Sequence, residues 1–67
     1  MKDYVTFDPV ARKVLGTGIC QDDAVALQVI EPGHVARELV RPLRPQDLTI
    51  DEAGVVRDAT GARATVE

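Results

Sequence analysis

The chain has 67 residues, of which 45% are hydrophobic and 28% charged, and its formal net charge is -3. A single cysteine and a single histidine exclude an internal disulfide framework and a zinc site built from His and Cys ligands, and the acidic balance argues against nucleic acid or an anionic membrane as a partner. A folded protein of this mass exposes roughly 4,100 Å², and so small a core leads us to expect that the chain forms an oligomer.

β-branched residues dominate the composition. Ten Val, three Ile and five Thr stand against five Leu, and such side chains favour strands because they are stiff at χ1 and suit a pleated surface. The longest apolar stretch, residues 24–27, is too short for a transmembrane span, and we expect no signal peptide. We therefore predict one mainly β domain over residues 1–67, an antiparallel meander or barrel-like sheet of about six or seven short strands with one optional short helical turn.

The first predicted element is a hairpin over residues 4–15. The proline at its centre presets φ for the second position of a turn, and the side chain of Asp8 can accept a hydrogen bond from the main chain two residues on. The sequence Gly-Thr-Gly at residues 16–18 is expected to interrupt the second strand as a bulge or a close backbone approach. The strand then resumes at residues 19–20.

A polar loop at residues 21–23 follows the hairpin. Asp22 or Asp23 can cap a short helical turn over residues 24–27, because an aspartate in front of a first turn accepts hydrogen bonds from its free N–H groups. A short strand is then expected over residues 27–30.

The next break is a turn at residues 31–34, Glu-Pro-Gly-His. Proline at the second position and glycine at the third predict a type II turn, since Gly33 takes the required positive φ without strain. Further on, Pro42 and Pro45 indicate an irregular connector over residues 41–46.

The segment between these breaks, residues 34–40, admits two interpretations. A helix would place Val35, Ala36, Leu39 and Val40 on one face. A strand would instead bring Val35, Arg37 and Leu39 together. We favour the strand and keep the helix as the alternative.

The C-terminal third repeats an Asp-x-x-Gly pattern at residues 51–54 and 58–61. Each copy predicts a type I turn followed by glycine in the left-handed conformation, so that three short strands form a tight meander. The expected strands cover residues 47–51, 55–58 and 62–66. Alternation along them would place one face of the meander in the core. That face would hold Leu48 and Ile50, one of Val55 or Val56, and either Val66 or Ala64.

Few residues could carry chemistry. Cys20 and His34 are the only candidates for a nucleophile and its base, and each is better explained as a small buried hydrophobe and as a turn residue. The acidic pair 22–23 together with residues 51–52 lacks the spacing of a calcium loop. We therefore predict that the chain is not an enzyme and has no catalytic residue, cofactor or metal site.

A partner interface is predicted on the connector and its flanks. Apolar anchors beside a basic rim are typical of protein interfaces. Without an interleaved aromatic residue, this basic cluster does not predict nucleic-acid binding. The predicted interface consists of Arg37, Leu39, Val40, Arg41, Leu43 and Arg44.

Five turn and loop signals follow one another along residues 4–57. They are the Asp8-Pro9 hairpin, Gly16-Thr17-Gly18, the acidic loop before residues 24–28, the turn at residues 31–34, and Ile50-Asp51 with Gly54-Val55. The order of these signals resembles that in small proteins encoded beside the tail-fibre genes of tailed bacteriophages and prophages.

That resemblance implies a virion or tail-associated structural role without catalysis. The domain would pack against copies of itself or dock on a tail or fibre protein, in the virion or in the host cytoplasm during assembly. Two alternatives stay open, an assembly chaperone or adaptor for tail fibres and a small host binding module of unknown ligand.

Overall fold

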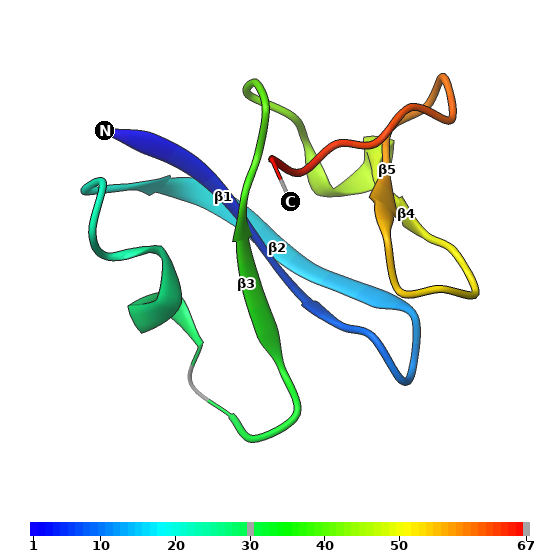
Figure 1. The fold of residues 1–67 in the computed structure, drawn as a ribbon, viewed down its shortest axis with the longest axis horizontal. Coiled ribbons are helices and arrows are strands. Elements are labelled where there is room, and N and C mark those ends of the chain that lie inside the picture. Colours follow the sequence, from blue (N-terminus) through cyan, green and yellow to red (C-terminus); the bar gives the residue numbers. More distant parts are fainter. Residues whose placement is uncertain (30, 67) are drawn as a thin grey trace.

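The computed structural model describes residues 1–29 and 31–66. These residues form five strands in two antiparallel sheets and two short 3-10 helices (Figure 1). The mainly β fold expected from the composition is therefore confirmed. Six or seven strands were expected, and residues 27–29 and 62–66 are the expected segments that do not form strands.

The larger sheet holds three strands in the order β2-β1-β3. Its first two strands are the predicted hairpin, closed by a turn in which the carboxylate of Asp8 accepts hydrogen bonds from the N–H groups of Val10 and Ala11. The strands are β1 (Lys2–Asp8), β2 (Lys13–Cys20) and β3 (Val35–Glu38).

The Gly-Thr-Gly stretch lies inside β2 and does not interrupt it. Thr6 pairs with Gly16 whereas Phe7 pairs with Val14, so Leu15 is the extra residue of a bulge. At Gly18 the Tyr4 side chain lies over the main chain, because a Cβ there would lie 2.6 Å from the Tyr4 hydroxyl oxygen. The expected bulge therefore occurs, at Leu15 within one continuous strand, and the close neighbour of Gly18 is a side chain instead of a backbone.

The segment after β2 corrects two predictions. The 3-10 helix η1 (Val25–Gln28) has Ala24 at its N-cap and no side-chain cap, and Asp22 instead pairs with the N-terminal amino group at 3.0 Å. The strand expected at residues 27–30 is also absent from residues 27–29, because Leu27 donates its main-chain N–H to the Ala24 carbonyl and so closes a helical turn. Ile30 lies outside the described residues.

The predicted type II turn and the strand after it are confirmed. Gly33 has φ +86° and the His34 N–H donates to the Glu31 carbonyl at 3.3 Å. The following residues form β3, so the strand interpretation of residues 34–40 is correct for its central part. The irregular connector then contains the 3-10 helix η2 (Pro45–Asp47), which begins at its second proline.

The smaller sheet pairs β4 (Thr49–Ile50) with β5 (Val56–Arg57). Both Asp-x-x-Gly turns form as predicted, with φ +81° at Gly54 and +84° at Gly61. In each turn the glycine N–H donates to the aspartate carbonyl at 3.0 Å. Residues 62–66, expected as a third strand, make only isolated bridges.

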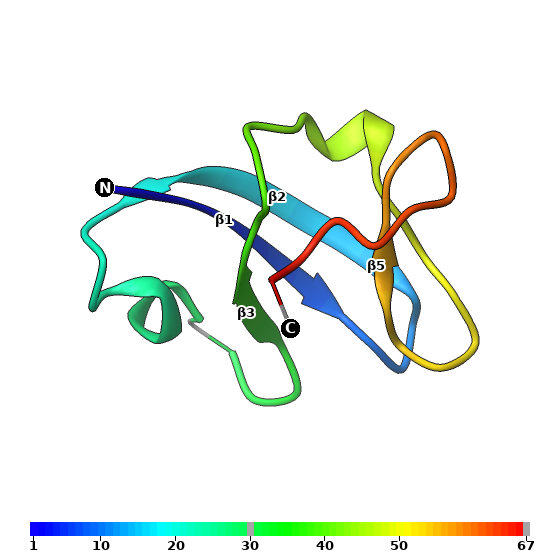
Figure 2. The ribbon, with the colours of Figure 1, turned by 45° about the horizontal axis from the view of Figure 1, so that its top comes forward.

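This C-terminal segment links the two sheets (Figure 2). Ala64 donates its N–H to Val56 of β5 and accepts a hydrogen bond from Val40, while Val66 donates to Glu38 of β3. The result is a barrel-like path that runs from β2 through β1, β3 and β5 to β4. No ladder joins β2 to β4 in the described part of the chain, so these two strands are its free edges.

The core lies between the two sheets. It includes Leu48, Ile50, Val56 and Ala64, which form the face predicted for the C-terminal meander. Val66, the predicted alternative to Ala64, is 54% exposed. The accessible surface is 4422 Å², somewhat above the roughly 4,100 Å² typical of this mass. The core residues are Val5, Phe7, Leu39, Leu48, Ile50, Val56 and Ala64.

Within the described residues, no helix has the length and apolar character to cross a membrane.

Candidate interaction surface

The six residues of the predicted interface do not form one surface. Leu39 is only 4% exposed and belongs to the core, because its N–H donates to Asp3 of β1 and extends the sheet beyond β3. It is therefore wrong as an exposed anchor. Val40, the next residue, points the other way and is 50% exposed.

Two of the three predicted interface arginines are engaged elsewhere. Arg41 donates to a carboxylate oxygen of Asp58 at 2.8 Å and ties the connector to the second Asp-x-x-Gly turn. Arg37 donates to the carbonyl of Ala36 and lines a groove between the two sheets. Arg41 and Arg44 both remain exposed on the connector, whereas Arg37 belongs to the groove, so the expected rim of three arginines is not assembled.

An apolar groove lies at the open end of the first hairpin, where β1 begins and β2 ends, and we call it the hairpin-end groove. Leu39 forms part of its wall, and Leu43 is partly buried against the core, while Ile19 on β2 is 64% exposed. A second hollow, shared by Leu43 and Arg44, adjoins it. The hairpin-end groove has a volume of about 170 Å³ and is lined by Asp3, Thr17, Gly18, Ile19, Leu39, Pro42 and Leu43.

Beside this groove runs the free edge of β2. The hydrogen bond from Leu39 to the Asp3 carbonyl means that the odd residues of β1 face β3. The even residues of β1 then face their partners on β2, which include Gly18. The main-chain groups of Thr17 and Ile19 therefore point away from the sheet.

Part of this edge lacks the usual protection against strand pairing. Natural edge strands are guarded by charged side chains, proline or bulges; residues 14–20 contain no charged residue and no proline, and the bulge lies at Leu15, near the start of the strand. Leu15 and Ile19 are 42% and 64% exposed along it. The stretch after the bulge can add a strand from another chain.

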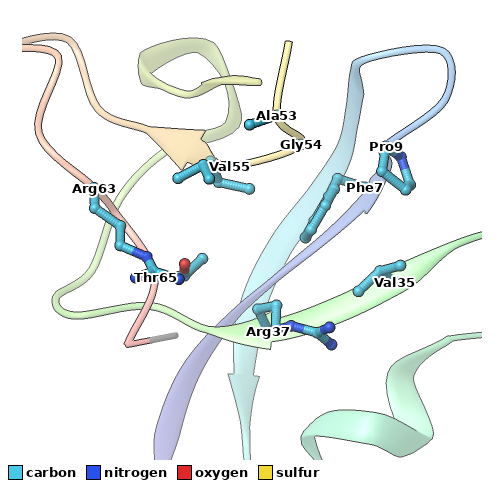
Figure 3. Close-up of a pocket in the computed structure, with 10 residues that line it drawn as sticks. Phe7, Pro9, Val35, Arg37, Ala53, Gly54, Val55, Arg63 and Thr65 are labelled. Carbon is cyan, nitrogen blue, oxygen red and sulfur yellow. The ribbon is translucent and has the colours of Figure 1, made fainter. Parts of the chain in front are cut away.

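A larger groove lies between the two sheets, with a volume of about 360 Å³ (Figure 3). Phe7, Val35 and Val55 give it apolar walls, and Arg37 and Arg63 supply two guanidinium groups. Neither arginine forms an ion pair with another described residue, and no carboxylate lines the groove. Such a site can hold an anionic group attached to an apolar body.

Hydrogen bonds within the fold favour the charged form of both turn aspartates. The Thr60 hydroxyl and the Arg41 guanidinium donate to Asp58 and, with two main-chain N–H groups, hold the pKa of its carboxyl well below the ordinary value. The Val55 N–H and the Arg57 side chain likewise lower the pKa of Asp51. Both carboxylates are satisfied within the fold and serve the turns.

The sequence candidates for chemistry are separated. Cys20 is buried at the end of β2, whereas His34 precedes β3, with β1 between the two strands. His34 lies 3.7 Å from a Glu31 carboxylate oxygen. Among residues 1–29 and 31–66, no group of three His, Cys, Asp or Glu side chains is placed to hold a metal ion.

Sequence reasoning missed two features of this surface. The β2 edge was signalled by Leu15 and Ile19 in a charge-free stretch, but its exposure depends on which strand lies beside it. The groove between the sheets joins Phe7 to Arg63, which are too far apart in the chain for any local pattern to connect. No protein-family model, no curated protein and no solved structure matches the chain.

Proposed function

We propose that this protein is a non-enzymatic interaction module that packs against another protein chain. The observation that carries the proposal is the free edge of β2, which presents outward main-chain groups and exposed apolar side chains beside the hairpin-end groove. From the predicted interface, Leu43 lines the hairpin-end groove and Arg44 lines the hollow that adjoins it.

Strand addition supplies affinity through main-chain hydrogen bonds and specificity through the side chains beside them. The β2 edge offers main-chain groups for these hydrogen bonds, and the hairpin-end groove offers the side-chain contacts that give specificity. We further propose that the partner is a copy of the chain or a tail or fibre protein of a bacteriophage or prophage, as the order of turns implies. An assembly chaperone for tail fibres would use the same surface transiently.

Particle composition tests this proposal. We expect the chain in gradient-purified phage particles by mass spectrometry, and Ile19→Lys should reduce its amount at least tenfold. Val10→Lys is the matched control, because Val10 is 92% exposed in the turn of the same hairpin. A chain bound to fibre subunits before assembly but absent from particles would indicate the chaperone. Equal incorporation of both variants would contradict the role of the β2 edge.

A small ligand-binding module is the second candidate, and the groove between the sheets favours it. Phenylacetate carries a carboxylate on an apolar ring, and its neutral analogue phenethyl alcohol does not. We expect phenylacetate alone to shift the amide resonances of Val35 and Val55 in two-dimensional NMR, and Arg63→Gln to weaken the effect. Equal shifts with both compounds, or none, would contradict a site for anionic ligands.

A further inference from the structure

We infer that the occupant of the β2 edge is a second copy of this chain, paired antiparallel with its own β2 about a two-fold axis at Thr17. This inference rests on the proposed function, because it names the partner of the same surface. A two-fold contact must present one patch to itself, so every residue that meets the partner must find a suitable residue in return.

The main chain satisfies this condition. Thr17 and Ile19 direct their N–H and C=O groups outward, as derived from the pairing of β1 with its two neighbours. An axis at Thr17 sets Thr17 opposite itself, whereas an axis midway between two residues would set outward groups opposite groups that already pair with β1. An axis at Gly16 or Gly18 would set Thr17 opposite Leu15 or Ile19, so only the axis at Thr17 brings the two apolar residues Leu15 and Ile19 together.

The side chains also satisfy the condition that a two-fold contact must be complementary to itself. In this register Leu15 faces Ile19 of the second copy, and the same pair forms again across the axis. These two residues are 42% and 64% exposed in one chain, and apolar cross-strand pairs stabilise antiparallel sheets. An axis two residues further along, at Ile19, would instead place Leu15 opposite Asp23.

Charge does not oppose the pairing. Lys13 is the only charged residue of β2, and it lies beyond the bulge at Leu15, outside the paired stretch of residues 15–19. The alternative edge, β4, has only two residues and offers far fewer main-chain groups. Joining two three-stranded sheets through β2 would give one continuous six-stranded sheet with its longest free edge removed.

Disulfide trapping tests the register. In a Cys20→Ala background, we expect Thr17→Cys to form a disulfide-linked dimer in air. Directly opposed residues of a hydrogen-bonded pair lie about 5.5 Å apart at Cα, within the range of about 4.4–6.8 Å that a disulfide spans. Thr49→Cys, on the exposed side of β4, is the matched control, and Thr17→Cys should form dimer at least ten times faster.

A mixing experiment guards against a folding defect in the Thr17 variant. Leu15→Cys and Ile19→Cys should each dimerise slowly alone and quickly when mixed, because the register pairs Leu15 only with Ile19. Mass spectrometry of the linked peptides gives the pairing directly. Dimer formation no faster than in the Thr49→Cys control, or no gain on mixing, would overturn the inference.

Different results would contradict the interaction module and the two-fold dimer. If Ile19→Lys blocks incorporation into particles while Thr17→Cys gives no more trapped dimer than Thr49→Cys, the second copy is wrong and the interaction module stands. If Ile19→Lys and Val10→Lys behave alike both in particles and in dimer formation, the β2 edge is not the contact surface and both proposals fail.

Discussion

The two sheets of this small protein are stabilised in different ways. In the N-terminal sheet, strands of seven, eight and four residues align through ladders of main-chain hydrogen bonds. In the C-terminal region the two strands have two residues each, and turn carboxylates take over much of the hydrogen bonding. Asp51 and Asp58 each accept hydrogen bonds from main-chain N–H groups and from an arginine.

The difference explains where the molecule can make contacts. The C-terminal turns satisfy their polar groups internally, since Asp58 is only 5% exposed and its neighbour Arg57 bridges both turns through Asp51 and the Gly61 carbonyl. A ladder, in contrast, always ends at an edge. The longer sheet therefore leaves β2 open, and the region with the more regular structure is the one available to a partner.

The largest expected effect comes from the core that both regions share. Phe7→Ala should lower the free energy of unfolding by about 3–5 kcal/mol, because the ring is buried in the cluster that contains Ile50 and Val56. Urea denaturation should show a single transition for both regions. Val10→Ala, in the exposed turn, should change stability by less than about 0.5 kcal/mol. Separate transitions for the two sheets would contradict a shared core.

Acid should act mainly on the C-terminal region. The pKa values of Asp51 and Asp58 are lowered in the folded state, so the unfolded chain binds more protons at low pH. Their contribution to stability is fully present above the ordinary aspartate pKa of about 3.9 and is lost as the pH falls below it. Thermal unfolding followed from pH 7 to pH 2 measures this loss.

Asp58→Asn should be less stable at neutral pH and should lose less stability on acidification, because it removes one of the two turn carboxylates whose pKa is lowered in the folded state. Arg41→Met should reduce the pH dependence in part, since it removes one donor to Asp58. The same steep pH dependence in Asp58→Asn as in the wild type would contradict this assignment.

A smaller effect on the free energy of unfolding is expected when glycines are replaced by alanine, and it differs between turn and strand positions. Gly61→Ala should cost about 1–2 kcal/mol, because φ is +84° there and no neighbour lies within 4 Å of an added Cβ. Gly16→Ala, inside β2, meets only the Thr6 hydroxyl at 4.0 Å and should be neutral or stabilising by up to about 1 kcal/mol. Equal losses in chemical denaturation would contradict this distinction.

Local chemistry explains which parts of the fold could be predicted from the sequence. The turns at Gly33, Gly54 and Gly61 were correct because only glycine tolerates their positive φ. Residues 27–29 were wrongly expected as strand, since a hydrogen bond to Ala24 outweighed the preference of their β-branched neighbours.

The interaction surface was harder to predict. Leu39 and Val40 were both assigned to it, although neighbouring residues of an extended chain face opposite sides. The pairing of Arg41 with Asp58 joins residues 17 positions apart, and no local pattern indicates it. The free edge of β2 follows from the absence, among residues 1–29 and 31–66, of a second strand hydrogen-bonded to it, which depends on the complete fold.

The β2 edge is tested most directly by the mass of the protein in solution. Ile19→Lys should change the free energy of unfolding of one chain by less than about 0.5 kcal/mol, because the side chain is largely exposed. Light scattering over a wide concentration range should give twice the 7.2 kDa of one chain for the wild type and for Val10→Lys, and 7.2 kDa for Ile19→Lys. A wild-type mass of 7.2 kDa at every concentration, or the same mass for both lysine variants, would contradict assembly through this edge.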